Sequence, residues 1–408
     1  MKWSRGCMTV LCMLALGCSA SPTGSNETAA SSTTARSPVA PPAATATPGA
    51  PPSLSGFPPA PTNPFPSAEE AALQATLIEA SERLPGVSAT VIQEGRGTWT
   101  GVAGTADGTQ PIQASSQFGI ASITKTVIAT EIMRLAEQGS FNLTDQVSDH
   151  LPANFTFNTN GATIQNLLSM ESGIPDPGLD PTESTSNPLR VWTPEEVLAT
   201  VPSNRTKPGD HFVYEDSNYM LLGLVIEATT GTTVAQALRK GVMADPRFAS
   251  LVYQPAERPQ GPLALPYVGA LADGPNASGG GYLPSAAAAS GGNGSGCMAS
   301  DSGTLALFGY ELFGGRLISP RSIEQMTQFK PGLPNAPYGM GVFDQTTLAD
   351  QFPVYAVGNG GWDDFGYSSE LVVLPSEGIS ISVLTNMAGD PVSLVIPIAQ
   401  QLAKELST

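Results

Sequence analysis

The sequence predicts an α+β fold, in which an antiparallel sheet is flanked by helices and lies beside a mainly helical subdomain. Two observations support this prediction. Strand-like segments occur near both ends of the folded part of the chain, and helical patterns with long loops fill the region between them. A single sheet built from both ends, with a helical insertion between its strands, satisfies both observations.

The first 17 residues have the pattern of an export signal. Lys2 and Arg5 give a positive start, and the apolar run CMTVLCMLAL is too short to span a bilayer stably. The segment LALGC ends at Cys18 and resembles a bacterial lipobox, which implies that Cys18 carries lipid and begins the mature chain. The alternative is an ordinary cleaved signal with a coincidental cysteine.

Residues 18–66 are rich in Ser, Thr, Ala and Pro, and only Glu27 and Arg36 among them are charged. Such a composition buries too little apolar surface to offset its chain entropy, so we expect a disordered tether. The folded domain would then span residues 67–408. We expect an extracytoplasmic protein, held to the cell membrane by the lipid on Cys18.

The overall composition disfavours several classes of function. The formal net charge is −17, and so acidic a surface repels phosphate backbones, which argues against nucleic-acid binding. Cys7 and Cys12 leave with the signal and Cys18 carries lipid, so Cys297 remains alone and cannot form an intrachain disulfide. No Cys/His spacing suits zinc, and we expect no cofactor.

The folded part begins with a helix and two strands. Residues 67–84 start with a serine and acids in the first turn and repeat apolar residues at helical spacing. Residues 87–95 and 97–106 alternate as two short antiparallel strands. A further helix runs from Ser122 to about Gln138, with its apolar residues on one face, and ends at Gly139.

The region from Leu143 to about Arg321 is mostly helical, most clearly in TIQNLLSMESGIPD and NYMLLGLVIEATTG. Residues 254–296 are rich in Pro, Gly and Ala, which predicts a long surface loop. Strand character returns in YGMGVF, PVYAVG, YSSELVVL and GISISVLTN, and an amphipathic helix from Val392 to Leu406 follows.

Few nucleophilic mechanisms fit the available side chains. His150 and His211 are the only histidines and no G-x-S-x-G sequence occurs, so a Ser-His-Asp triad has little support. A lysine base needs neither histidine nor metal. Ser122 and Lys125 lie three residues apart at a predicted helix start, where the lysine Nζ can approach the serine Oγ. The backbone N–H of Ser122 is there free to help hold an oxyanion.

Lys125 must be neutral to accept a proton from Ser122. We therefore expect a partly desolvated cleft, in which another cation or a nearby tyrosine lowers the lysine pKa. The alternative is that Ser122 is an N-cap and Lys125 a solvated surface residue.

Further segments, in order along the chain, resemble the serine β-lactamase and penicillin-binding-protein superfamily, in its class C, DD-peptidase and esterase branch. FGIASITKTVIA is similar to the nucleophile motif of that family. Later blocks that resemble it are FNLTDQVSDHLP, TIQNLLSMESGIPD, KPGDHFVYEDSNYMLLGLVIEATTG, GCMASDSGTLALF, YGMGVF and GNGGWDDFGYSSELVVLPSEGISISVLTN. The resemblance covers nearly all of residues 67–408 and implies a β-lactamase/transpeptidase-like fold.

The resemblance also implies roles for two residues of the KPGDHFVYEDSNY block. It places the tyrosine of the family at Tyr214 and its Asn/Asp position at Asp216, as part of the substrate site. A tyrosine near a cationic lysine can hold or pass on the proton that Ser122 loses, and then protonate the leaving group. The alternative for Tyr214 is an aromatic side chain that only packs at the base of a helix.

The third motif of the family is K-T-G or H-x-G, and here it falls on Asn359-Gly360-Gly361. Asn359 can donate a hydrogen bond to substrate but carries no charge. The glycines would let the backbone approach a substrate closely, and the N–H of Trp362 would be the second oxyanion donor. The alternative is that GNGGW forms a turn between two strands.

Two functions remain open. An active serine hydrolase would attack an ester, lactam or peptide carbonyl through Ser122, pass the proton to Lys125 with Tyr214, and release the acyl group to water. Because Asn359 is neutral, we expect esters to be preferred over substrates that carry a carboxylate. The alternative is a catalytically silent surface binding protein that kept the fold and the cleft.

Overall fold

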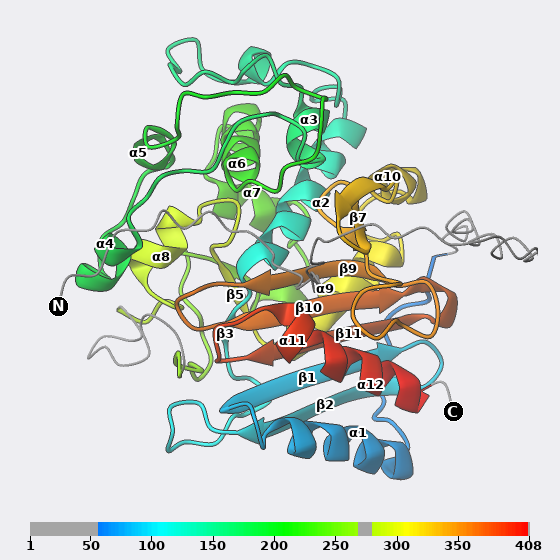
Figure 1. The fold of residues 1–408 in the computed structure, drawn as a ribbon. Coiled ribbons are helices and arrows are strands. Elements are labelled where there is room, and N and C mark those ends of the chain that lie inside the picture. The colour runs from blue at the N-terminus through cyan, green and yellow to red at the C-terminus, as the bar shows by residue number, and fades with distance from the viewer. Residues whose placement is uncertain (1–55, 268–279, 407–408) are drawn as a thin grey trace, which may run out of the picture. The chain divides into compact units, whose positions relative to one another are not determined.

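Eight antiparallel strands form the main sheet, in the order β2-β1-β11-β10-β9-β8-β7-β6 (Figure 1). This is the computed structural model of the chain, and it describes residues 56–267 and 280–406. The strands are β1 (Gly86–Gln93), β2 (Gly97–Gly104), β6 (Lys330–Leu333), β7 (Ala336–Tyr338), β8 (Phe343–Asp344), β9 (Val357–Trp362), β10 (Ser368–Leu374) and β11 (Ile379–Thr385). Strand β1 pairs with β11 from Val87↔Thr385 to Gln93↔Ile379, so the predicted sheet joining both ends of the chain is confirmed.

The helices cover the sheet and build the subdomain beside it (Figure 1). They are α1 (Ser67–Ala80), α2 (Thr124–Glu137), α3 (Ile164–Leu168), α4 (Pro181–Ser186), α5 (Pro194–Leu198), α6 (Ser217–Thr230), α7 (Val234–Lys240), α8 (Ala286–Gly291), α9 (Ser302–Phe313), α10 (Pro320–Met326), α11 (Pro391–Leu394) and α12 (Ile396–Leu406). Short 3-10 turns lie at Ala121–Ile123, Val147–His150, Pro246–Phe248 and Pro375–Glu377. The antiparallel sheet flanked by helices agrees with the predicted fold class.

Apolar alternation along the strands builds a core on each side of the sheet. In β10, Val372 and Leu374 join the cluster that includes buried residues of α1 and α12. The alternate residues Leu371 and Val373 join the larger cluster that includes α9 and α2. Because successive side chains of a strand point to opposite faces, one seven-residue strand serves both cores.

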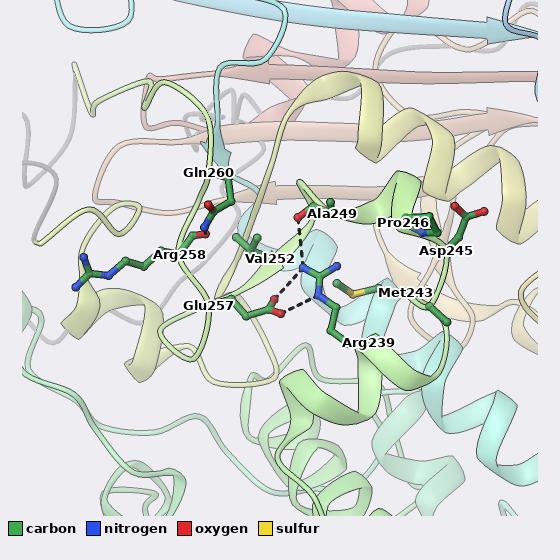
Figure 2. A pocket seen from close by; sticks show the side chains of 10 residues that line it. Arg239, Met243, Asp245, Pro246, Ala249, Val252, Glu257, Arg258 and Gln260 are labelled. Atoms are coloured by element: carbon green, nitrogen blue, oxygen red, sulfur yellow. Dashed lines mark hydrogen bonds and ion pairs between the residues drawn. The ribbon is translucent and has the colours of Figure 1, made fainter.

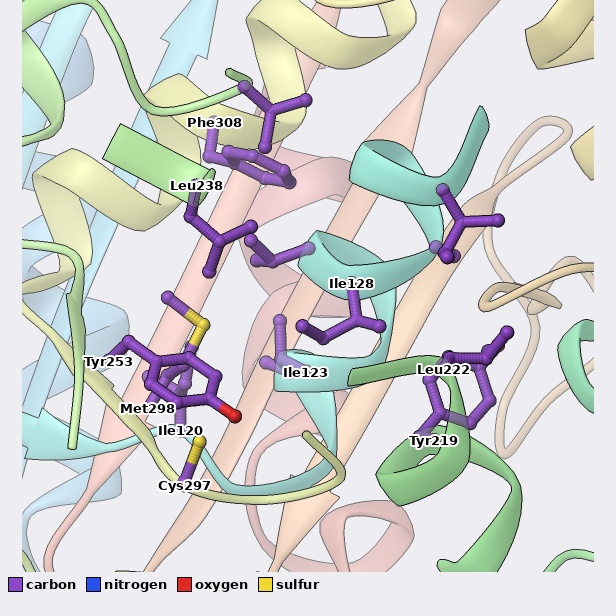
Figure 3. Close-up of a cluster of buried hydrophobic side chains, with 14 of the residues drawn as sticks. Ile120, Ile123, Ile128, Tyr219, Leu222, Leu238, Tyr253, Cys297, Met298 and Phe308 are labelled. Carbon is purple, nitrogen blue, oxygen red and sulfur yellow. The ribbon is translucent and has the colours of Figure 1, made fainter. Parts of the chain in front are cut away.

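Helix α2 runs through the larger core, which fixes the position of its first turn. Figure 3 shows Ile123 and Ile128 packed among apolar side chains that include Leu222 of α6 and Phe308 of α9. Since every residue from Thr124 to Met133 is buried, α2 has no solvated face along most of its length. The residues just before it are held equally firmly, because β3 (Phe118–Gly119) pairs with β5 (Met298–Ser300), which also pairs with β4 (Val252–Tyr253).

Several predicted boundaries are wrong, each for a local reason. Strand β9 begins at Val357, so PVYAVG is mostly not a strand and the following GNGGW is one. YGMGVF is mainly a turn from Gly339 to Val342, which separates Tyr338, the last residue of β7, from Phe343, the first residue of β8. The last predicted helix divides into α11 and α12 at Val395.

The Gly-rich stretch between residues 254 and 296 is not only a surface loop. The side chain of Gln254 is fully buried and donates hydrogen bonds to the carbonyl oxygens of Leu283, at 2.8 Å, and Cys297, at 2.9 Å. Helix α8 lies within the stretch, and its residues pack into the interior. The end of this segment therefore forms part of the core, next to α2.

Residues 56–66, predicted as the end of a disordered tether, are packed against the domain. Phe57 is 7% exposed and its ring centroid lies 5.0 Å from that of Tyr310. The carbonyl of Phe57 accepts a hydrogen bond from Arg316 at 2.6 Å, and Pro64 bridges Thr98 at the free edge of β2. The tether can therefore extend only as far as residue 55. The export signal and Cys18 lie outside the described residues and stay predictions.

Within residues 56–267 and 280–406, no single helix is long and apolar enough to cross a membrane. Helices α6 and α7 reach the required length and composition only as a pair, across a bend of 67°.

Phe57→Ala is expected to lower the free energy of unfolding by about 3 kcal/mol, because it removes a buried ring that holds the N-terminal segment to α9. The measurement is urea unfolding of the full chain. Ile78→Ala, which removes a side chain 57% exposed on α1, is the matched control and should change that free energy by no more than about 0.5 kcal/mol. Equal losses in the two variants would contradict the docking of this segment.

Candidate active site

Ser122 stands at a sharp entry into α2. The preceding Ala121 has φ of 43°, in the left-handed region that a residue with a Cβ rarely adopts, and Ser122 itself lies in the 3-10 turn before the helix. Strain of this kind persists only where the surrounding structure enforces it, and it is concentrated at functional sites. The turn leaves Ser122 half-exposed, between two buried neighbours.

Lys125 is fully buried and lies against Ser122. Its Nζ donates to Ser122 Oγ at 2.9 Å and to the carbonyl oxygen of Ser295 at 2.9 Å, and it forms an ion pair with Asp216 Oδ1 at 2.7 Å. The expectation that these two side chains meet therefore agrees with the geometry, and the alternative of a solvated Lys125 is excluded.

The charge state of Lys125 differs from the expectation. Burial by itself lowers the pKa of Lys125, but the carboxylate of Asp216 and the side chain of Tyr214 outweigh burial and raise that pKa above its usual value. Of the two groups expected to lower this pKa, a second cation or a tyrosine, the tyrosine is present but raises the pKa, and the charged side chain in contact with Lys125 is an acid. The resting side chain is an ammonium group with three acceptors.

Tyr214 lies beside this ammonium group, within a cluster of aromatic rings. The Lys125 Nζ is 4.9 Å from the Tyr214 ring centroid. Phe343 stacks on the tyrosine at 5.9 Å and an angle of 17°, and Tyr338 meets its edge at 5.9 Å. Packing and proximity to Lys125 thus coexist, and the geometry fits both interpretations of Tyr214.

Asn359 lies beneath the nucleophile, inside the protein. Its side chain is fully buried, and the amide nitrogen donates to the Ser122 carbonyl at 3.3 Å, the Gly341 carbonyl at 3.2 Å and Thr126 Oγ1 at 3.2 Å. The expected contact of this amide with substrate is therefore not what the structure shows. The amide instead joins β9 to the first turns of α2.

The glycines after Asn359 do bring the backbone close to the nucleophile. A Cβ on Gly361 would lie 3.0 Å from the backbone nitrogen of Ser122 and 2.3 Å from the carbonyl oxygen of Ile120. A Cβ on Gly360, which faces the other side of the sheet, would meet Glu370 and Pro391. Trp362 ends the strand, with its side chain 41% exposed. Because β9 runs beside Ser122, the alternative of a simple turn at GNGGW is excluded.

Three further groups around Lys125 and Asp216 could not be identified from the sequence. The carbonyl of Ser295 comes from the Gly-rich stretch, where composition carries no signal for such a contact. Asp176 accepts a hydrogen bond from the backbone N–H of Asp216 through its Oδ1. Glu215, between Tyr214 and Asp216, is half-buried. Glu215 and Asp216 directly follow Tyr214, so the sequence indicates acids at this point of the motif. Only the fold shows that Asp176 lies beside them.

A separate hollow of about 540 Å³ is lined by residues between Arg239 of α7 and Gln260, which include Val252 of β4 (Figure 2). Arg239 and Glu257 form an ion pair across it at 2.7 Å, and Arg239 also donates to backbone carbonyls of Phe248 and Leu251. None of the candidate site residues lines this hollow. Because Glu257 and two backbone carbonyls already bind the guanidinium group of Arg239, the Arg239–Glu257 pair has a structural role.

Comparisons with known proteins identify the family of the chain. The profile of the Beta-lactamase family matches residues 69–403. Among curated proteins, Protein flp of Staphylococcus aureus is 34% identical over 155 residues, which is 36% of this chain and 30% of that protein. Penicillin-binding protein 4* of Bacillus subtilis is 28% identical over 136 residues, 33% of this chain and 30% of that protein. The matched stretches thus span about a third of the length of these relatives.

Solved structures resemble the chain over a longer span. D-amino acid amidase from Ochrobactrum anthropi SV3, in complex with L-phenylalanine amide, superposes with a TM-score of 0.71 at 23% identity, covering 84% of this chain and 99% of that one. D-stereospecific amidohydrolase from Streptomyces sp. gives a TM-score of 0.66 at 26% identity, covering 82% and 97%. With the family profile spanning most of the chain, the protein belongs to the beta-lactamase family, within the superfamily of serine β-lactamases and penicillin-binding proteins.

Proposed function

We propose that this protein is an exported, membrane-tethered serine hydrolase that acts through an acyl-enzyme on Ser122 and favours esters over carboxylate-bearing substrates. The observation that carries the proposal is the 2.9 Å contact between Ser122 Oγ and the fully buried Lys125 Nζ. Burying a charged lysine away from water costs free energy, so the fold must compensate for it. Of the three groups that contact Lys125 Nζ, Ser122 is the one with a nucleophilic side chain.

The reaction would begin with attack of Ser122 Oγ on the substrate carbonyl. The serine proton must leave toward Lys125 or Tyr214, and Tyr214 is the group able to pass it on to the leaving oxygen or nitrogen. The N–H groups of Ser122 and Trp362 would hold the oxyanion, since β9 lies directly beside the nucleophile. Water would then release the acyl group from Ser122.

The preference for esters rests on the charges around the cleft. Asn359 supplies no cation, and its amide is engaged inside the protein. Asp216 instead contacts Lys125, and Asp176 and Glu215 add two further carboxyl groups beside Asp216. A carboxylate on the substrate would meet net negative charge there, whereas a neutral or ammonium-bearing substrate would not.

Amides of amino acids are the second candidate substrate class. Two observations favour them: the acids at the cleft could receive the free ammonium group of such a substrate, and the solved structures that resemble this chain include a D-amino acid amidase. A catalytically silent binding protein is less well supported, because the Ser122–Lys125 contact has no need to persist in a protein without catalysis.

Ser122→Ala is expected to abolish turnover of p-nitrophenyl butyrate and covalent labelling by a fluorophosphonate probe, with the fold intact. Lys125→Ala should lower turnover by roughly three orders of magnitude or more, as expected for members of one nucleophilic unit. Ser148→Ala and Lys240→Ala, at exposed positions, are the matched controls. Wild-type rates in the Ser122→Ala protein would disprove this site.

Three D-alanine p-nitroanilides, with the amine free, acetylated or succinylated, test the charge preference. We expect kcat/KM for the succinylated substrate to be at least about tenfold below that for the acetylated one, because its carboxylate meets the acids at the cleft without a counter-charge. The difference should shrink in high salt, since ions screen exposed charges. A preference for the succinylated substrate would mean that a cation elsewhere receives carboxylates.

Cys18→Ser should release the protein from cell membranes into the soluble fraction, because a lipid on Cys18 is the proposed anchor. Fractionation of cells that express each form, with acyl chains detected by mass spectrometry, makes the measurement. If wild-type protein carries no acyl chain and is secreted whole, the signal is of the ordinary cleaved kind.

A further inference from the structure

Ser369 is a buried serine of β10 that contacts two segments of backbone at once. Its side chain has no solvent exposure, and its Oγ donates to the carbonyl oxygen of Ile120 at 2.9 Å and to that of Gly361 at 3.2 Å. Ile120 lies two residues before Ser122, and Gly361 directly precedes Trp362. One hydroxyl group therefore joins the two stretches of backbone whose N–H groups would hold the oxyanion.

The pairing of β9 with β10 fixes the direction of the Trp362 N–H. The N–H of Asp363 donates to the Tyr367 carbonyl at 3.1 Å, so these residues form a hydrogen-bonded pair. Bonded and non-bonded pairs alternate along antiparallel strands, which makes Trp362 and Ser368 a non-bonded pair. The N–H of Trp362 therefore points away from β10. On that side β8 pairs with β9 only as far as Gly358, so no strand of the described chain covers this N–H.

The Ser369 hydroxyl acts on this N–H through the preceding peptide bond. The Gly361 carbonyl and the Trp362 N–H belong to one planar trans peptide group, in which the C=O and the N–H point in opposite directions. A contact that holds the carbonyl from the side of β10 therefore also fixes the N–H on the opposite side.

The same hydroxyl holds the turn that presents the Ser122 N–H. The Ile120 carbonyl accepts hydrogen bonds from Ser369 at 2.9 Å and from the Ile123 N–H at 3.1 Å, which closes the 3-10 turn. Among the described residues, no group accepts a hydrogen bond from the Ser122 N–H. Ala121, within this turn, has the strained φ of 43°, and such strain persists only where neighbouring groups enforce it. Ser369 supplies one of these constraints.

Two other buried serines of the sheet show what is particular to Ser369. Ser380 and Ser382 of β11 are also fully buried, and each donates to one carbonyl of α9, at 2.7 Å and 2.6 Å. Those bonds join the sheet to a helix. Of the three serines, Ser369 is the one that binds the segments on either side of the nucleophile.

We propose that Ser369 is a positioning residue for the proposed hydrolysis, which sets the separation between the Ser122 and Trp362 N–H groups and so shapes the oxyanion pocket. The inference rests on the proposed function of Ser122. Donors stabilise a tetrahedral intermediate only at hydrogen-bonding distance from its oxygen, and displacements of about half an ångström already weaken them. Without the hydroxyl, the carbonyls of Ile120 and Gly361 lose their common partner and can move apart.

Ser369→Ala should lower kcat/KM for p-nitrophenyl butyrate by about tenfold or more, because this constant reports on the acylation of Ser122, in which the oxyanion forms. Ser380→Ala removes a hydroxyl of equal burial that donates to α9, and is the matched control. It should keep kcat/KM within about twofold of the wild type. Complete fluorophosphonate labelling counts the active sites in each preparation, and thermal melting checks the fold.

A thionoester, p-nitrophenyl thionobutyrate, separates positioning from general loosening of the protein. Sulfur is larger than oxygen and a weaker acceptor, so a pocket that fits an oxyanion should favour the oxygen ester. In Ser369→Ala this preference should fall by at least about threefold, because the donors no longer match the oxyanion. General loosening would slow both esters equally. Ser369→Cys carries the same test if Ser369→Ala does not fold: its thiol is a weaker donor, so its preference should be intermediate.

The expected result is a lower kcat/KM and a weaker preference for the oxygen ester in the folded Ser369 variants, with neither change in Ser380→Ala. A folded Ser369→Ala or Ser369→Cys protein with the wild-type preference, or an equal loss of preference in Ser380→Ala, would overturn the inference and leave the proposed function intact. A wild-type protein that takes no fluorophosphonate label and hydrolyses neither ester would overturn the proposed function and this inference together.

Discussion

The buried ammonium group of Lys125 is the constraint on which the rest of the site depends. A charge removed from water is tolerated only when other groups replace its hydration. Its three partners come from distant parts of the chain: Ser122 at the start of α2, Asp216 at the start of α6, and Ser295 after α8. The protein must therefore bring these three segments together, or leave a positive charge unpaired in its core.

The same demand explains the close backbone packing around Ser122. Gly341 has φ of 81°, and a Cβ there would lie 2.5 Å from that of Ala129 in α2. This close approach lets its carbonyl accept hydrogen bonds from Thr126 Oγ1 at 2.7 Å and from Asn359 at 3.2 Å. Gly361 brings β9 to the other side of the serine. Small residues thus let a strand and a loop press on the first turn of α2, which enforces the left-handed backbone at Ala121.

The fold class and the Ser122–Lys125 contact could be predicted from the sequence because both follow from local patterns. Alternation predicts strands, and a spacing of three residues on a helix places two side chains side by side. The sign of the pKa shift at Lys125 could not be predicted, because it depends on Asp216, 91 positions later in the chain. Burial lowers the pKa of Lys125 and an acidic neighbour raises it. Which effect prevails depends on how closely Asp216 approaches the lysine, and only the fold shows that distance.

Asn359 illustrates a second limit. Alignment with a family motif predicts only that Asn359 lies on a strand beside the nucleophile, and β9 does pass Ser122. Whether the side chain faces a substrate or the interior depends on side-chain length: the short amide reaches the carbonyls of Ser122 and Gly341 and the hydroxyl of Thr126, all within the protein.

The neutral amide at position 359 has a consequence for the charges of the whole site. Among the residues that the structure describes, Lys125 is then the one cation in contact with the nucleophile, and Asp216 already neutralises it. Asp176 and Glu215 adjoin Asp216, so the charges of this group of side chains sum to a net negative value. The preference for substrate charge and the charge state of Lys125 would therefore share one origin, because Asp216, which would repel a substrate carboxylate, also holds Lys125 in its protonated form.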